Sequence, residues 1–160
     1  DAPGACTLIA VPPHGAEPPM TATASILLPG AALVFLTFIV AVTMFRRRVR
    51  QMKAERIHPQ AVATSTQVAA LLTDSAAADN FRNLFEVPVL FYFALATCAA
   101  TGLADTATLA LAWAFVASRV LHSWIQCTAN KVMHRFRAYA LGLFVLLALW
   151  VRITVHLLVG

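Results

Sequence analysis

The stretch NLFEVPVLFYF, residues 83–93, places two polar side chains in an otherwise apolar segment. Asn83 and Glu86 are three residues apart, so on a helix they share one face. A carboxylate in an apolar segment is costly to bury, and it usually pairs with a cation, faces a ligand or lies on a proton pathway. The spacing therefore indicates either a contact that fixes helix packing or one wall of a ligand site.

A second set of polar side chains follows in residues 119–130. Arg119, His122 and Gln126 stand at i, i+3 and i+7, and Asn130 lies four residues further on. This spacing places all four side chains on one stripe of a helix. The stripe indicates a buried polar network, which either serves packing alone or also lines a ligand site.

The two sets lie at similar depths in their expected helices. Glu86 is about five residues inside the start of its helix, or roughly 8 Å, and Arg119 is roughly 12 Å from the end of the next one. Because helices joined by a short turn run antiparallel, we expect Glu86 and Arg119 to form a buried ion pair. Asn83 and His122 would complete this network. Such a pair is weak evidence of stability, but it can specify how helices pack.

Two further features bear on the chemistry of this region. Arg135 and Tyr139 are four residues apart and share a face where the last apolar stretch begins. Arg135 stands at the membrane boundary, so the residue types alone favour a solvated topological anchor over a site residue. Pro88 lacks the N–H that a helix interior requires, and it predicts a kink two residues after Glu86.

The elements that position these residues are predicted to be membrane-spanning helices. Of the 160 residues, 60% are hydrophobic and only 12% are charged, and the mean hydropathy is +0.76. About a quarter of the residues of a soluble domain are charged, so the composition excludes an ordinary soluble protein. The net charge of +5 does not indicate nucleic-acid binding, since the basic residues adjoin apolar runs and membrane lipids are the expected surroundings.

Four apolar stretches are long enough to span a bilayer, which takes about 20 residues. They cover residues 26–45, 81–101, 106–127 and 138–158. The expected fold class is therefore an all-α integral membrane protein with a four-transmembrane-helix bundle. TGLADT, residues 101–106, is too short for anything but a tight turn and predicts an antiparallel hairpin of the second and third spans. AVATSTQVAALL, in the connection between the first two spans, predicts a short helix at the surface.

Residues 1–25 are expected to form a disordered tail, because residues 1–19 hold five prolines and show little periodicity. Met20 is a candidate for the natural start of the chain. Cys6, Cys98 and Cys127 are far apart and form no CxxC pair. No metal site or disulfide framework is therefore predicted.

Basic residues predict the orientation in the membrane. The first connection carries six of them and the third carries Lys131, Arg135 and Arg137, while the turn between the second and third spans carries none. By the positive-inside rule, the first and third connections face the cytoplasm and both termini lie on the other side. The run RRRVR, residues 46–50, is interpreted as a topological anchor, with a substrate or lipid-headgroup contact as the alternative.

Three stretches together resemble the MAPEG family, the membrane-associated proteins in eicosanoid and glutathione metabolism. They are FRNLFEVPVLFYF (81–93), RVLHSWIQ (119–126) and MHRFRAY (133–139). The resemblance extends over residues 26–158 and is greatest to the bacterial branch, which indicates a bacterial inner membrane. It implies a homotrimer of four-helix subunits that binds glutathione between neighbouring subunits, near the cytoplasmic side.

The resemblance also implies roles for individual residues. Arg135 matches the arginine that activates the thiol of glutathione, which makes it the catalytic candidate. A guanidinium beside a thiol of pKa about 8.5 favours the nucleophilic thiolate. Asn83 and Glu86 match residues that contact the peptide of glutathione. The other positions that match polar residues of the family are Arg82, Arg119, His122, Tyr139 and, in the basic run, Arg47.

Two positions depart from the family pattern. Asp79 replaces an arginine that glutathione-using members carry four residues before the motif asparagine, and Gln126 replaces a tyrosine of their third helix. The Asp79 carboxylate would repel a carboxylate of glutathione rather than hold it. A glutathione site in this chain would therefore differ from the family's at these two points.

Three classes of function follow from these residues. The first is a glutathione-dependent transferase or peroxidase that acts on lipophilic electrophiles. The second is a non-enzymatic trimeric scaffold or lipophile-binding protein, in which the network of glutamate, arginine and histidine serves packing alone. The third is a small proton-coupled transporter, which an intramembrane carboxylate can support but which the expected Glu86–Arg119 pair disfavours.

Overall fold

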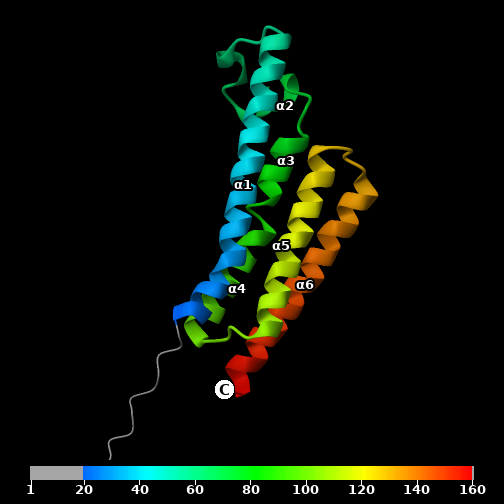
Figure 1. Ribbon diagram of the computed structural model, residues 1–160. Coiled ribbons are helices and arrows are strands. Elements are labelled where there is room, and N and C mark those ends of the chain that lie inside the picture. The colour runs from blue at the N-terminus through cyan, green and yellow to red at the C-terminus, as the bar shows by residue number, and fades with distance from the viewer. Residues whose placement is uncertain (1–19, 160) are drawn as a thin grey trace, which may run out of the picture.

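The computed structural model describes residues 20–159, and every element within this range is a helix. In chain order the elements are α1 (Met20–Ala54), the short 3-10 turn η1 (Pro59–Val62), α2 (Ser65–Leu71), α3 (Ala76–Asn83), α4 (Val87–Thr101), α5 (Thr106–Cys127) and α6 (Val132–Val159) (Figure 1). Four stretches are long and apolar enough to cross a membrane. The predicted all-α architecture with four spans is thereby confirmed, while residues 1–19 of the predicted tail lie outside the described residues.

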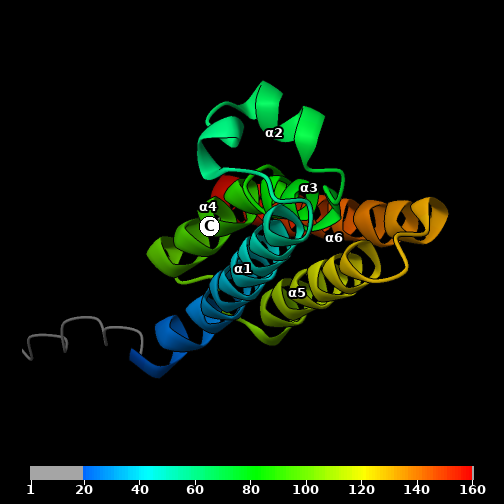
Figure 2. The same cartoon turned by 90° about the horizontal axis from the view of Figure 1, so that it is seen from above.

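The four spans form a bundle in which neighbours in sequence are not always neighbours in space (Figures 1 and 2). α5 packs along α6 and also on α1, while α4 packs on α1 and α6. α4 and α5 therefore lie diagonally across the bundle, and at its centre the rings of Phe91 and Phe115 stack with 4.4 Å between their centroids. The predicted tight turn is present over residues 102–105, and α4 and α5 run antiparallel (Figure 1), but the more extensive packing is between α5 and α6.

The second span is broken just before Pro88. α3 ends at Asn83 and α4 begins at Val87, with a turn over residues 84–86 between them. Pro88 has no N–H to donate to the carbonyl four residues earlier, and its ring clashes with that carbonyl. It therefore occupies the first turn of a new helix, where the N–H is not needed. The kink predicted at Pro88 is present as a full break, and Glu86 becomes the residue that precedes α4.

Two of the other spans extend beyond their apolar stretches. α5 covers residues 106–127 as predicted, whereas α1 continues through the basic run to Ala54 and α6 begins at Val132 rather than at residue 138. Arginine and lysine are good helix formers. A helix can therefore continue beyond its apolar stretch, and the apolar stretch alone gives too short a helix. The short helix predicted in the first connection is present as α2, where Thr64 and Gln67 form a capping box.

At the end of the bundle that carries the α4–α5 turn, one polar cluster ties α6 to the start of α5. Asp105 is the N-cap of α5, and its Oδ1 accepts hydrogen bonds from the backbone N–H of Thr108 at 2.9 Å and from the Thr108 hydroxyl at 2.6 Å. Arg152 forms an ion pair with Oδ2 of Asp105 and donates from Nε to Oγ1 of Thr108 at 2.9 Å. The hydrogen bonds from Thr108, followed by the charge of Arg152, lower the pKa of Asp105.

Asp105→Ala should lower the thermal unfolding midpoint of the detergent-solubilised protein, since loss of an N-cap costs about 1 kcal/mol. Because the folded-state pKa of Asp105 lies below its unfolded value, the stabilisation is present above the unfolded pKa of about 3.9. It is lost as the pH falls through the folded value. The difference in midpoint between wild type and variant should therefore hold between about pH 7 and pH 5 and shrink below about pH 4.

The matched control is Glu55→Gln, which changes an exposed carboxylate at the other end of the molecule. Its difference from wild type should be small at each pH. A difference for Asp105→Ala that stays constant down to about pH 3 would contradict the role assigned to the ionised carboxylate.

Candidate functional site

The polar residues of the α5 stripe gather at the end of the bundle that carries the α5–α6 loop (Figure 1). Arg119 is fully buried between α5 and α6. Its Nη2 donates hydrogen bonds to the backbone carbonyls of Tyr139 at 3.0 Å and of Ala138 at 3.3 Å. The guanidinium also lies over the Tyr139 ring, 4.8 Å from its centroid, in a favourable cation–π arrangement. Backbone carbonyls and an aromatic ring thus take the place that a carboxylate was predicted to fill.

Gly142 provides the room that this guanidinium occupies. A Cβ at residue 142 would overlap the hydroxyl of Ser118 and the guanidinium of Arg119. Small residues let membrane helices approach closely, and here the approach brings Arg119 within reach of the α6 carbonyls. Gly142 carries no signal in the sequence, because a glycine that accommodates a partner's side chain looks like any other glycine in a helix.

The ion pair predicted between Glu86 and Arg119 does not form in this chain, and the prediction is wrong. Glu86 is exposed and precedes α4, which packs on α1 and α6 rather than along α5. Within residues 20–159 the ion pairs are Arg47–Asp74, Arg82–Asp79 and Arg152–Asp105. The second span does reach α5 through Asn83, but the turn over residues 84–86 leaves Glu86 exposed. The expected pairing with Arg119 was the argument against a proton-coupling role for Glu86. Because the pair does not form, that argument no longer applies.

His122 links the stripe on α5 to the first turns of α6. Its imidazole is buried, with Nδ1 3.1 Å from the carbonyl oxygen of Arg135 and the ring centroid 5.7 Å from that of Tyr139. Because a carbonyl oxygen only accepts, Nδ1 carries the proton in this contact. Nε2 of His122 and Nε of Arg119 are buried and have no hydrogen-bond partner in the described part of the chain. Both atoms are shielded from solvent, since Arg119 is 1% and His122 is 3% exposed.

Arg135 stands half-buried in the first turn of α6. Its Nη1 donates a 2.8 Å hydrogen bond to the side-chain oxygen of Asn130. Asn130 has a left-handed backbone with φ of 46°, a conformation that asparagine adopts more readily than most residues. Asn130 holds the guanidinium and His122 holds the carbonyl of Arg135, so this residue is fixed relative to α5 while the rest of its N–H donors stay accessible.

A second polar layer joins α3 to α5. Asn83 donates from Nδ2 to Oε1 of Gln126 at 3.3 Å. The buried Asn80 accepts from Ser123 at 3.3 Å, and its amide donates to Sγ of Cys127 at 3.6 Å. Gln126 is itself buried, so it serves to hold Asn83. Sequence reasoning missed Asn80 and Ser123, although Asn80 lies three residues before Asn83 and so shares its face of α3.

Two of the predicted basic site residues are held by carboxylates. Nη1 of Arg47, on α1, lies 3.3 Å from Asp74, and Nη2 donates to the backbone carbonyl of Cys127. Nη1 of the exposed Arg82 lies 3.7 Å from Asp79, one turn earlier in α3. Asp74 was missed because it lies in a connection without periodicity, where no pattern indicates which way its side chain points.

The predicted site residues therefore divide into groups. Those that meet between α5 and α6 are Arg119, His122, Arg135 and Tyr139. Asn83 and Arg47 contact α5 from α3 and α1, while Glu86 and Arg82 are exposed and joined to neither group. Within the described residues no group of three or more His, Cys, Asp or Glu side chains could hold a metal ion.

A sequence model of the MAPEG family matches residues 26–155, a range that contains every residue of both polar layers. The chain belongs to the MAPEG family. No curated protein and no solved structure matches it. Family membership and the four spans together make this MAPEG protein a multi-pass integral membrane protein.

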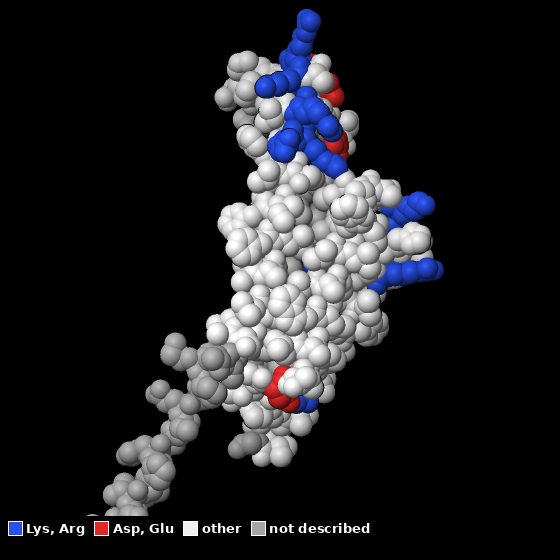
Figure 3. Space-filling model, viewed as in Figure 1, with Lys and Arg blue, Asp and Glu red and all other residues white. Residues whose placement is uncertain are grey.

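The charged residues of this MAPEG protein lie toward the ends of the bundle. Figure 3 shows Lys and Arg gathered over the end of α1 and beside the α5–α6 loop, with an uncharged surface between them and the far end. Large apolar side chains such as Phe35 and Phe144 are exposed on the spans. A surface of this kind suits the hydrocarbon of a bilayer.

Gly142→Ala should destabilise the protein by about 1–3 kcal/mol, the usual cost of overpacking a core, because the added Cβ displaces the Arg119 guanidinium from the α6 carbonyls. Helix propensity alone predicts the opposite sign, since alanine is favoured over glycine by about 1 kcal/mol. The thermal unfolding midpoint in detergent, compared between wild type and variant, shows whether the substitution stabilises or destabilises the protein.

Gly30→Ala is the matched control, because its Cβ would come nearest to the movable end of Leu95, at 3.0 Å, and would meet the Tyr92 ring at an ordinary contact distance of 3.8 Å. We expect this variant to lose less stability than Gly142→Ala. If Gly142→Ala were as stable as the wild type, the packing of Arg119 against Gly142 would be refuted.

Proposed function

We propose that this protein is a glutathione-dependent membrane enzyme, a transferase or peroxidase, that acts on lipophilic electrophiles. The observation that carries the proposal is the state of Arg135. Asn130 holds its guanidinium and His122 holds its carbonyl, while its remaining N–H donors are unused. Activation of a thiol requires a fixed, accessible cation of this kind. The match of Arg135 to the thiol-activating arginine of the family supports the same role.

The proposed chemistry begins with the thiol of glutathione beside Arg135. A thiol of pKa about 8.5 is mostly protonated at neutral pH, and an adjacent guanidinium stabilises the thiolate. The thiol proton passes to solvent, an electron pair of the sulfur forms the bond to the electrophilic carbon, and the bond from that carbon to its leaving group breaks, with the electron pair going to the leaving group. In the peroxidase reaction the thiolate attacks a peroxide oxygen instead, the O–O bond breaks, and the alcohol leaves as the sulfur is oxidised to a sulfenic acid. A second glutathione thiol then attacks this sulfur, which releases water and gives glutathione disulfide.

Two polar atoms near Arg135 would bear on glutathione only through a change in packing. Nε of Arg119 and Nε2 of His122 have no hydrogen-bond partner within residues 20–159 and are buried. A tripeptide reaches them only if the contact between α5 and α6 opens as it binds. Asp79, whose charge opposes glutathione, is held by Ser75 and Arg82, so its repulsion is partly neutralised.

The proposal includes a homotrimer that binds glutathione between subunits on the cytoplasmic side of a bacterial inner membrane. Asn83 reaches α5 through Gln126, whereas Glu86 is exposed and contacts neither polar layer, so we expect it to meet glutathione bound to a neighbouring subunit. The basic residues around Arg135 favour the cytoplasmic side. An apolar groove of about 300 Å³ between α1 and α5, lined in part by Ile39 and Trp124, offers a place for the lipophilic electrophile.

Arg135→Ala should reduce kcat with glutathione and an aromatic electrophile about 10- to 100-fold, since raising the thiol pKa by one to two units removes that share of thiolate. The pH–rate profile of the variant should move upward, toward the ordinary thiol pKa. Arg135→Lys should restore part of the rate, because a cation remains beside the sulfur.

Arg137→Ala is the matched control, as it removes an exposed arginine two residues away on the same helix. It should keep the wild-type rate. Equal rates for wild type and Arg135→Ala, or no rate above the detergent background, would contradict the proposed catalytic role of Arg135.

A second candidate, the non-enzymatic scaffold or lipophile-binding protein, is favoured by one observation. Arg119 and His122 reach three backbone carbonyls of α6, which is an arrangement that packs two helices. Glu86→Gln distinguishes the candidates. In a scaffold it weakens the oligomer with no effect on glutathione binding, whereas in the proposed enzyme it weakens glutathione binding as well. Proton release on substrate binding that disappears in Glu86→Gln would instead indicate a proton-coupled transporter.

A further inference from the structure

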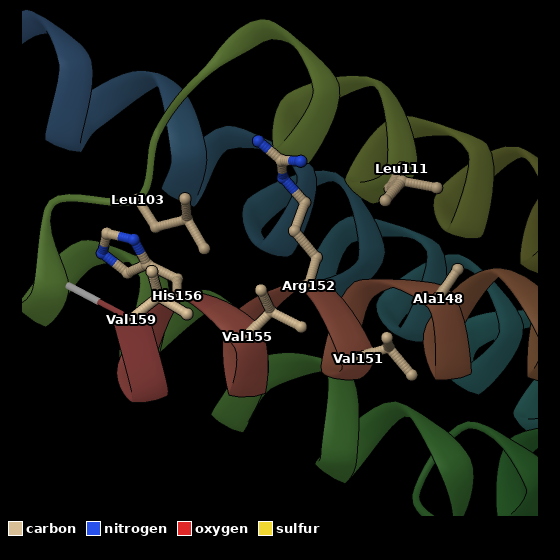
Figure 4. A pocket seen from close by; sticks show the side chains of 8 residues that line it. All are labelled: Leu103, Leu111, Ala148, Val151, Arg152, Val155, His156 and Val159. Atoms are coloured by element: carbon tan, nitrogen blue, oxygen red, sulfur yellow. The ribbon is translucent and has the colours of Figure 1, made fainter.

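A groove between α5 and α6 lies at the end of the bundle opposite to Arg135. Its volume is about 660 Å³, and the apolar residues that line it include Leu111, Ala148, Val151 and Val155. Figure 4 shows Arg152 and His156 projecting from the same side of α6. Arg152 follows Arg135 by seventeen residues in one helix, so the two lie roughly 25 Å apart along its axis. The groove is therefore separate from the site proposed for glutathione.

The ion pair between Arg152 and Asp105 lies beside this groove, and both side chains keep hydrogen-bonding capacity that the pair does not use. Arg152 has five N–H donors, of which one reaches Thr108 and one reaches Asp105. Oδ1 of Asp105 accepts two hydrogen bonds from Thr108, and Oδ2 accepts one from Arg152. Because each carboxylate oxygen can accept two, one acceptor site remains on Oδ2 beside the unused donors of Arg152. The side chains of Arg152 and Asp105 are 36% and 49% exposed, so both can meet a ligand.

The two charged groups lie where a membrane changes from hydrocarbon to headgroups. Asp105 directly precedes α5, and Arg152 is seven residues from the end of α6 at Val159, or roughly 10 Å. In Figure 3 this red and blue cluster stands apart from the other charged residues of the visible face. From this level Leu111, Ala148 and Val151 continue toward the middle of the bundle, while Val155, His156 and Val159 lie toward the end of α6.

We propose that the groove binds a zwitterionic phospholipid. One acyl chain lies against the apolar wall formed by Leu111, Ala148 and Val151. The lipid phosphate accepts from the unused donors of Arg152, and the headgroup ammonium lies beside Oδ2 of Asp105. A positive and a negative group side by side complement a headgroup that carries the same two charges in the opposite order.

The charge pattern also selects among lipids. A purely anionic headgroup would meet the Asp105 carboxylate beside Arg152, and a fatty acid would leave the acceptor site of Asp105 empty. The ammonium of phosphatidylethanolamine can donate N–H hydrogen bonds to Asp105, whereas the methylated ammonium of phosphatidylcholine cannot. Phosphatidylethanolamine is therefore the preferred occupant.

The experiment uses the full chain purified in detergent, with phosphatidylethanolamine, phosphatidylcholine and phosphatidylglycerol of identical acyl chains. Native mass spectrometry measures how much of each lipid the protein retains. We expect phosphatidylethanolamine to be retained about two- to fivefold better than phosphatidylglycerol, as one partly exposed charge contact allows. Equal retention of the three lipids, or a preference for phosphatidylglycerol, would overturn the proposal.

Two variants separate the headgroup contact from the acyl-chain contact. Asp105→Asn keeps a good N-cap residue and should abolish the preference for phosphatidylethanolamine over phosphatidylcholine. Ala148→Phe fills the groove from an exposed position and should lower the retention of all three lipids. Glu55→Gln, at an exposed carboxylate of the opposite end, should change neither property.

Two further outcomes would also count against the proposal. Asp105→Asn that keeps the wild-type lipid preference would show that the carboxylate does not recognise the headgroup. If Ala148→Phe changed the oligomeric state and left lipid retention unchanged, another copy of the chain would be the occupant of the groove.

Discussion

The burial of Arg119 is the constraint on which the α5–α6 half of the molecule depends. A guanidinium cannot shed its charge in a protein, so α6 must bring acceptors to it deep inside the bundle. The carbonyls of Ala138 and Tyr139 do this, and they can approach because residue 142 has no side chain. The same approach fixes the first turns of α6, and with them Arg135. The candidate catalytic residue is thus positioned by a charge that itself faces away from solvent.

The break before Pro88 has a comparable effect on the other half. An unbroken span would carry the amides of α3 in line with the apolar face of α4. The turn over residues 84–86 lets α3 set its own direction, so that Asn80 and Asn83 meet α5 while α4 packs on α1 and α6. One proline therefore separates a short helix with a polar face from an apolar spanning helix.

The fold class and the number of spans could be predicted from the sequence, because apolar length alone decides which segments cross a bilayer. Which spans touch could not, since a short turn sets the order of two helices but not their neighbours in a four-helix bundle. The Glu86–Arg119 pair failed because the break before Pro88 leaves Glu86 exposed, although Asn83 beside it reaches α5. The stripe of Arg119 and His122 was predictable from its spacing, whereas its partners are backbone carbonyls, which no residue type marks. The role of Gly142 could not be predicted either, because it depends on the lack of a side chain at that position and no residue pattern marks it.

The diagonal placement of α4 and α5 has a consequence for the order in which the chain assembles. α5 and α6 are joined by a four-residue loop, residues 128–131, and pack along each other, so their contacts close only a short stretch of chain. α4 is next to α5 in sequence, yet it packs on α6, which lies beyond α5, and on α1, which precedes it. Contacts between distant segments pay a larger loop-closure entropy. The second half of the chain is accordingly the part that can form first, and it offers α4 a finished surface on which to dock.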